Sequence, residues 1–190
     1  MTRLRRDRGL AITGVVLQLC TPGLGGCRRG DPPDAPPRVS VRLAPARSPL
    51  PPDTVRHTVY VPVYSALALG QDFTRDTVEL AATVSVRNVS AQSAIVIESA
   101  RYYDSAGKHV RDYIGTPSEL PPLATVEFIV LRVDTAGGPG ANFLIGWAGP
   151  PGVDAPLMEA VMVGQSGNAG ISFTSPGRTV ANPAESPTPR

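Results

Sequence analysis

The sequence predicts an all-β domain, built as a single antiparallel β-sandwich of seven to eight short strands. Apolar and polar residues alternate along several segments, and no segment has apolar residues at helical spacing. Glycine or proline separates these segments at short intervals, as turns between strands require. An immunoglobulin-like arrangement is the first choice within this class, and a small β-barrel is the alternative.

The first two strands are expected in HTVYVPVYSAL (57–67) and TVELAATVSVRNV (77–89). In the first, Pro62 cannot donate to a strand ladder, so we expect it at an edge or a bulge. In the second, one face is apolar and the other is largely polar, which is typical of a strand with one wet face. The expected inward residues of the two strands are Val59, Val61, Val63, Val78, Leu80, Ala82, Val84 and Val86.

The remaining strands follow in order along the chain. Asp104 and Gly107 suit a tight turn with a left-handed glycine, so 94–103 and 108–114 are predicted to form a hairpin. LATVEFIVLRVD (123–134) is a further strand, with Val126, Phe128 and Val130 on one face. Three more segments complete the set: ANFLIGWAG (141–149), PLMEAVMVG (156–164) and GISFTS (170–175).

The N-terminal segment, residues 1–26, is typical of a secretory signal, with four arginines ahead of a short apolar run. That run, 10–19, is too short to span a membrane. After this run, at the end of the N-terminal segment, comes Leu24-Gly25-Gly26-Cys27, which resembles the lipobox of bacterial lipoproteins. The resemblance implies that Cys27 is acylated and that the chain is cut before it.

Three further segments are expected after residue 26. Residues 27–53 comprise the lipidated cysteine and a proline-rich tether, because proline favours an extended spacer. Residues 54–178 form the sandwich domain and hold every aromatic residue, whereas 179–190 form a disordered tail. Since Cys20 would be removed and Cys27 lipidated, no structural disulfide is expected.

Charge excludes one class of partner. The whole chain is formally +2, and without residues 1–26 it has fourteen basic and fifteen acidic residues. These charges are scattered, whereas nucleic-acid binding requires a concentrated basic face. We therefore expect no nucleic-acid partner.

Five segments together resemble the bacterial Domain of Unknown Function 3124 family, whose members are often predicted lipoproteins. These segments are YVPVYS (60–65), RYYDSAGKHV (101–110), GGPGANFLIGW (137–147), EAVMVG (159–164) and GISFTSPGR (170–178). The resemblance spans about residues 58–179. It implies no established activity, cofactor or catalytic residue.

Catalytic and metal sites find little support. The two histidines, His57 and His109, are expected on the surface, and the serine of GQSGN (164–168) lacks the strand–elbow–helix setting of a hydrolase nucleophile. Met158 and Met162 have no chelating spacing with either histidine. We expect no catalytic residue, no metal and no cofactor.

A polar and aromatic set near the expected loops remains as the candidate binding surface. It comprises Arg101, Tyr102, Tyr103, Asp104, Asn142 and Arg178, with Trp147 nearby. Tyrosine, tryptophan and arginine are the usual anchors of binding surfaces. The alternative is structural: the tyrosines could pack across the sandwich, Asp104 could cap a turn, and Asn142 could satisfy loop backbone.

Two functions stay open. The favoured one is a non-catalytic binding module of the cell envelope, lipid-anchored on the periplasmic face of the outer membrane. The outer membrane is expected because Arg28, directly after the cysteine, favours it over the inner one. Its partners are the membrane, through the lipid, and an envelope protein or component. The alternative is an envelope hydrolase, which a deep pocket with two convergent titratable groups would favour.

Overall fold

The computed structural model describes residues 37–47, 49–70 and 76–180, and its described part is all-β. One sheet has six strands: β1 (Arg38–Val39), β4 (Ala66–Ala68), β5 (Thr77–Arg87), β9 (Thr125–Val130), β11 (Leu157–Ser166) and β12 (Ala169–Pro176). The other has seven: β2 (Ala44–Pro45), β3 (Val55–Pro62), β6 (Ile95–Tyr103), β7 (His109–Ile114), β8 (Ser118–Leu120), β10 (Asn142–Gly149) and β13 (Arg178–Val180).

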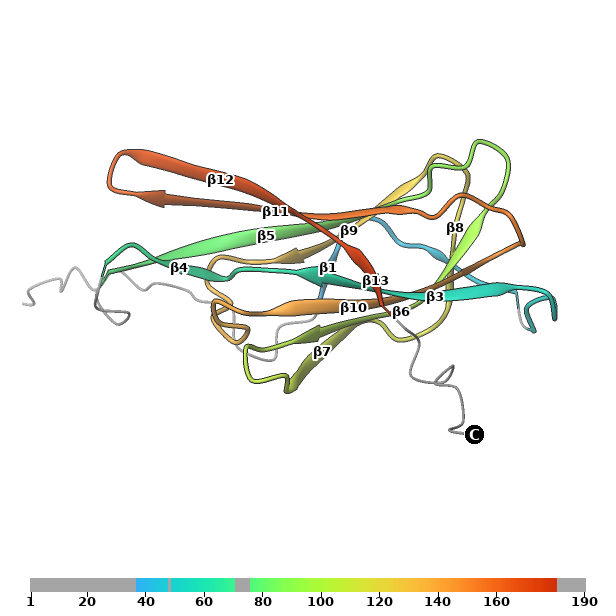
Figure 1. Cartoon of the computed structure of the whole chain (residues 1–190), viewed down its shortest axis with the longest axis horizontal. Helices are drawn as coiled ribbons and strands as arrows, with labels where there is room; N and C mark the ends of the chain where they lie inside the picture. Colours follow the sequence, from blue (N-terminus) through green and yellow to red (C-terminus); the bar gives the residue numbers. More distant parts are fainter. Residues whose placement is uncertain (1–36, 48, 71–75, 181–190) are drawn as a thin grey trace, which may run out of the picture.

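The two sheets pack face to face, so the predicted sandwich is confirmed (Figure 1). The order in the first sheet is β1-β9-β5-β11-β12, with β4 also on β5, and the order in the second is β13-β3-β10-β6-β8-β2, with β7 also on β6. Every pairing is antiparallel. Because the described strands form two separate sheets, the alternative of a closed barrel is wrong.

The strands are more numerous than the seven or eight predicted, because five of them are only two or three residues long. As in an immunoglobulin domain, consecutive strands cross between the sheets: β5 pairs with β9 in one, and β6 with β10 in the other. An immunoglobulin domain keeps its last strand beside the one before it. Here the last strand, β13, pairs with β3 in the other sheet instead, and β11 pairs with β5 and not with β10, the strand before it.

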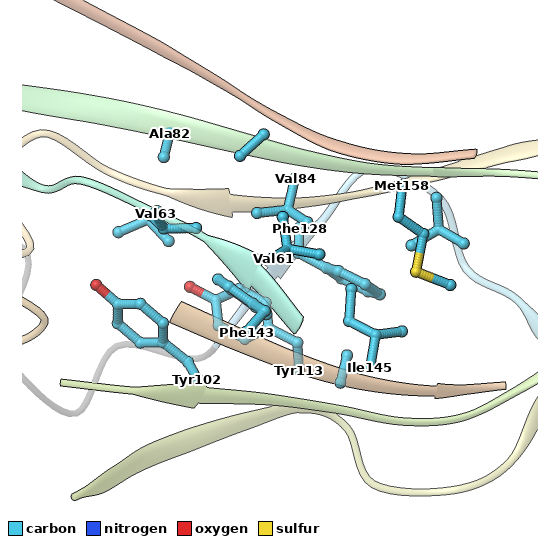
Figure 2. Close-up of a cluster of buried hydrophobic side chains, with 14 of the residues drawn as sticks. Val61, Val63, Ala82, Val84, Tyr102, Tyr113, Phe128, Phe143, Ile145 and Met158 are labelled. Atoms are coloured by element: carbon cyan, nitrogen blue, oxygen red, sulfur yellow. The ribbon is translucent and has the colours of Figure 1, made fainter. Parts of the chain in front are cut away.

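The core lies between the inward faces of β3, β5, β6, β9, β10 and β11 (Figure 2). All residues predicted to point inward from β3, β5 and β9, and Val63 just after β3, are buried. These residues are Val59, Val61, Val63, Val78, Leu80, Ala82, Val84, Val86, Val126, Phe128 and Val130. Aromatic rings fill the centre: Phe128 and Phe143 stack with centroids 6.1 Å apart, and Tyr113 lies 5.0 Å from Phe143. Strict alternation along each strand is what directs these side chains to one side.

Two local predictions are confirmed. β6 and β7 form the expected hairpin, and Gly107 in its turn has a φ of 77°. Pro62 lies beyond Tyr60, the last β3 residue that β13 covers, so no described strand pairs with the outer edge of β3 there. The missing donor therefore costs no ladder bond.

The proline-rich segment before residue 54 departs from the prediction of a tether. Arg38 pairs with Ile129, Ala44 pairs with Glu119, and Val39 and Leu43 pack against the core. The folded part thus begins before residue 54, because a few apolar residues between prolines suffice to add strands to two exposed edges. At the other end, β13 includes Thr179 and Val180 of the predicted tail.

The predicted signal, the lipobox with Cys27, residues 28–36 of the tether and the tail from 181 lie outside the described residues. Within the described ranges, no helix is long and apolar enough to cross a membrane.

Candidate functional site

The outer face of the seven-stranded sheet brings together most of the predicted binding residues. Opposite residues of paired antiparallel strands share a face of the sheet. In one row across four strands, Arg178 of β13 lies opposite Tyr60, Tyr60 opposite Leu144, and Leu144 opposite Arg101. At the usual strand spacing of about 4.8 Å, the backbones at Arg101 and Arg178 lie roughly 14 Å apart.

The next row on the same face adds Asn142 and Tyr103, which are directly opposite each other on β10 and β6. Tyr103 lies opposite His109 of β7, and their rings meet edge-on with centroids 5.5 Å apart. His109 Nε2 lies 3.0 Å from Asp112 Oδ1. Four of the six predicted residues therefore lie on one continuous face: Arg101, Tyr103, Asn142 and Arg178.

The two arginines of this face lack an ion-pair partner among the described residues. Arg101 and Arg178 are exposed, and neither forms an ion pair with any residue in the described part of the chain. Asp112, which is opposite Arg101 on β7, pairs with His109 instead. By contrast, Arg56 towards the other end of the same face is paired with Glu98 at 3.0 Å. The face therefore presents two guanidinium groups to solvent, one on the edge strand β13 and one on β6.

Tyr102 is not part of this surface, which corrects the prediction. Its side chain is 0% exposed, because it lies on the inward side of β6 between the outward Arg101 and Tyr103. Its ring packs 5.0 Å from Phe143 and 6.3 Å from Tyr113 (Figure 2). Burial, and secondarily the charge of Asp134, raises the pKa of the Tyr102 phenol far above its ordinary value.

The Tyr102 hydroxyl is buried and has no hydrogen-bond partner among the described residues. Gly137 packs directly against it, and a Cβ at that position would collide with the phenol oxygen. The nearby Tyr113 hydroxyl, in contrast, donates to Ile129 O at 3.2 Å. Burial raises the pKa of Tyr113 to about 12, although Arg111 partly opposes the shift.

Asp104 caps a turn, which was the structural alternative to a place in the binding surface. Its Oδ1 accepts hydrogen bonds from Ala106 N–H at 2.9 Å and Lys108 N–H at 2.8 Å. These bonds hold the β6–β7 turn and occupy one of the two carboxylate oxygens. Trp147 is likewise structural: it is buried on β10, and the exposed His57 covers it with ring centroids 5.2 Å apart.

Two serines that sequence reasoning missed hold the glycine-rich loop before β10. Ser105 Oγ donates to Gly137 O at 3.0 Å and accepts from Gly140 N–H at 2.8 Å. Ser65 Oγ donates to Gly138 O at 2.7 Å. These bonds hold the loop GGPGAN (137–142), in which Gly137 packs against the Tyr102 phenol. The one sequence signal was that both serines lie within three residues of the end of a strand, β3 for Ser65 and β6 for Ser105.

The described residues contain no group of three histidine, cysteine, aspartate or glutamate side chains that could hold a metal ion. One cavity of about 400 Å³ lies beside the C-terminal end of β10, between Pro51, Val96 and Ala148. The carboxyl groups of Asp53 and Glu119 line it, and no histidine, lysine, arginine or cysteine does so.

Comparison with known protein families shows to which family the chain belongs. The model of the family described as "Protein of unknown function (DUF3124)" matches residues 56–180. The chain belongs to the DUF3124 family. No curated protein and no solved structure matches it.

The DUF3124 match begins within β3 and ends with β13. It therefore includes the whole outer face with Arg101, Asn142 and Arg178, the hairpin of β6 and β7, and the loop over Tyr102. It leaves out β1 and β2, so these two strands are additions to the matched domain.

Proposed function

We propose that this DUF3124 protein is a lipid-anchored, non-catalytic binding module of the bacterial cell envelope. Acylated Cys27 anchors it, and the outer face of the seven-stranded sheet binds an envelope protein that presents carboxylates. The observation that supports this most is the row in which unpaired Arg101 and Arg178 flank Tyr60 and Leu144.

The composition of this row is that of a binding surface. Arginine and tyrosine are over-represented among residues that dominate binding energy. Tyr60 and Leu144 are half-buried, so they offer apolar surface without a loss of order on binding. Two uncompensated positive charges attract an acidic partner and orient it on approach.

The test is capture of the partner from native membranes with the lipidated protein. Arg101→Ala or Arg178→Ala should weaken capture at least tenfold, since a hot-spot residue contributes about 2 kcal/mol or more. Arg42→Ala is the matched control, because Arg42 is also exposed and has no ion pair in the described part of the chain, but lies away from this face. The melting temperature should be unchanged in all three variants. A fall in melting temperature in step with the loss of capture would contradict the proposal and make both arginines structural.

The anchor is tested separately. Cys27→Ser should abolish incorporation of labelled palmitate and leave an unprocessed or soluble chain. Wild-type protein that takes up no label and fractionates as soluble would refute the anchor. Density-gradient separation of the two membranes tests the outer-membrane assignment, which rests on Arg28 directly after Cys27.

The hydrolase alternative has one observation in its support, the cavity lined by Asp53 and Glu119. Its lining has no histidine, lysine or cysteine, so hydrolysis there would use the two carboxyl groups as acid and base. Asp53→Asn and Glu119→Gln should each abolish such an activity and leave partner capture unchanged. We favour binding because the arginines, in contrast, lie on an open face.

A further inference from the structure

The outermost strand of the six-stranded sheet, β12, has an open edge. Within the described residues it pairs only with β11, from Ala169 opposite Ser166 to Pro176 opposite Glu159. Figure 1 shows the β11–β12 hairpin reaching out at the upper left, with β12 on its outer margin. An open edge offers unpaired N–H and C=O groups to another strand.

The free groups on this edge can be identified. Gly177 N–H donates to Met158 O at 2.8 Å, and the register of β11 with β12 continues from there without a shift. In an antiparallel ladder, bonded and non-bonded pairs alternate. Gly170, Ser172 and Thr174 therefore direct their N–H and C=O groups away from β11.

The other sheet edges carry the features that normally prevent edge pairing. β1 and β4 have only two and three residues, β2 has two and includes Pro45, and β13 has three and includes Arg178. β7 carries His109, Arg111 and Asp112, and its pairing has two register shifts. β12 is eight residues long, its ladder is regular, and it contains no charged residue.

We propose that two copies of this chain associate through their β12 strands, which pair antiparallel about a twofold axis. A twofold axis pairs β12 with the same strand of the second copy. A charged residue near the axis would therefore lie close to the same charge in the other copy, and the two would repel each other. The uncharged β12 avoids this repulsion. Two of the segments outside the structure, 28–36 and 181–190, fit the edge less well, because each has three prolines and proline cannot donate to a ladder.

The register we propose is the one that pairs all three outward-facing residues of each copy. With Ser172 on the axis, Gly170 lies opposite Thr174 of the second copy, and Ile171 lies opposite its Phe173. Ile171 and Phe173 are only partly buried in one chain, where Phe173 meets Tyr64 edge-on at 5.7 Å. A β-branched residue opposite an aromatic one is a favourable cross-strand pair, and it would occur twice.

The test uses sedimentation velocity of the full chain with Cys20→Ser and Cys27→Ser, which removes both native thiols. This chain should shift from the mass of one chain to that of two as its concentration rises. Ser172→Lys should raise the dissociation constant at least about tenfold, because two ammonium groups would meet at the axis. Val163→Lys is the matched control: Val163 lies opposite Ser172 on β11, is 47% exposed and lies one strand inside the edge.

Cross-linking tests the register in the same background. Ser172→Cys should form a disulfide-linked dimer under mild oxidation, since bonded antiparallel pairs have Cα atoms about 5.5 Å apart. Thr174→Cys, on the same exposed side of β12, should not, because its mate is Gly170. A parent chain that keeps the mass of one chain at every concentration would overturn the proposal and leave this edge to a strand of another protein. Equal effects of the two lysines, or equal cross-linking of the two cysteines, would overturn it as well.

Discussion

At the residue scale, Tyr102 shows how one step along a strand changes a role. Arg101 and Tyr103 face solvent, whereas Tyr102 faces the core with its hydroxyl unpartnered among the described residues. A buried polar group without a hydrogen bond is destabilising, since folding removes its water. The ring itself contributes by packing on Phe143 and Tyr113.

Replacing Tyr102 by phenylalanine keeps the ring and removes the unpartnered hydroxyl. We expect Tyr102→Phe to raise the free energy of unfolding by about 1 kcal/mol. The matched change Tyr113→Phe removes the bond to Ile129 O and should lower it by a similar amount. Urea unfolding of both variants measures the difference. A loss of stability in Tyr102→Phe would show that its hydroxyl has a partner.

The same tyrosines predict the response to alkaline pH. Their folded pKa values lie above the ordinary value of 10.0, so the folded chain keeps protons that the unfolded chain loses. Stability is therefore complete below pH 10 and falls from there to pH 12, by up to about 1.4 kcal/mol per pH unit for each tyrosine. The double variant Tyr102→Phe, Tyr113→Phe should show a shallower decline in urea midpoint between pH 9 and pH 11.5. An unchanged decline would assign alkaline unfolding to other groups.

Gly107 adopts a left-handed conformation in the hairpin turn, with nothing within 4 Å of a Cβ built there. The cost of a side chain is thus conformational and not steric. Gly107→Val should lower the free energy of unfolding by roughly 1–2 kcal/mol or more, and Gly107→Asn by less, because asparagine tolerates this region. Thermal unfolding of both variants tests this. Equal melting temperatures would contradict it.

At the element scale, short additional strands cover edges of both sheets. β1 extends β9 and β2 extends β8, although both come from a proline-rich segment. Val39 and Leu43 attach that segment to the core. We regard β1 and β2 as stabilising additions to the DUF3124 domain, which the family match does not include.

These additions predict a difference between two chain lengths. A chain of residues 54–180 should fold but be less stable than one of residues 37–180, by about 1–3 kcal/mol for the apolar area that Val39 and Leu43 bury. Urea unfolding of both chains measures it. Val39→Ser in the longer chain should produce part of the loss. Identical stability of the two chains would mean that the segment only lies on the surface.

At the scale of the whole molecule, the sandwich is held by its core alone. Both cysteines, Cys20 and Cys27, precede the described residues, so no disulfide joins the sheets. Residues 37–180 should give a β-type far-UV spectrum and one cooperative transition, with the same melting temperature with and without reductant. A helix-rich spectrum, or a transition that reductant lowers, would contradict this.

Local patterns in the amino-acid sequence were enough to predict the all-β class, the inward faces of β3, β5 and β9, and the turn at Gly107, because alternation and turn chemistry depend on neighbouring residues alone. The sequence also predicted that Arg101, Tyr103, Asn142 and Arg178 belong together, although it could not place them in space. That Tyr102 is internal became clear only from the packing of the sheets, since its segment is apolar on both sides and its register depends on β10. Three further features depend on which distant strand lies alongside, so the local sequence could not predict them. Residues 38–45 add two strands, Asp112 leaves Arg101 without an ion pair, and β12 is the outermost strand of its sheet.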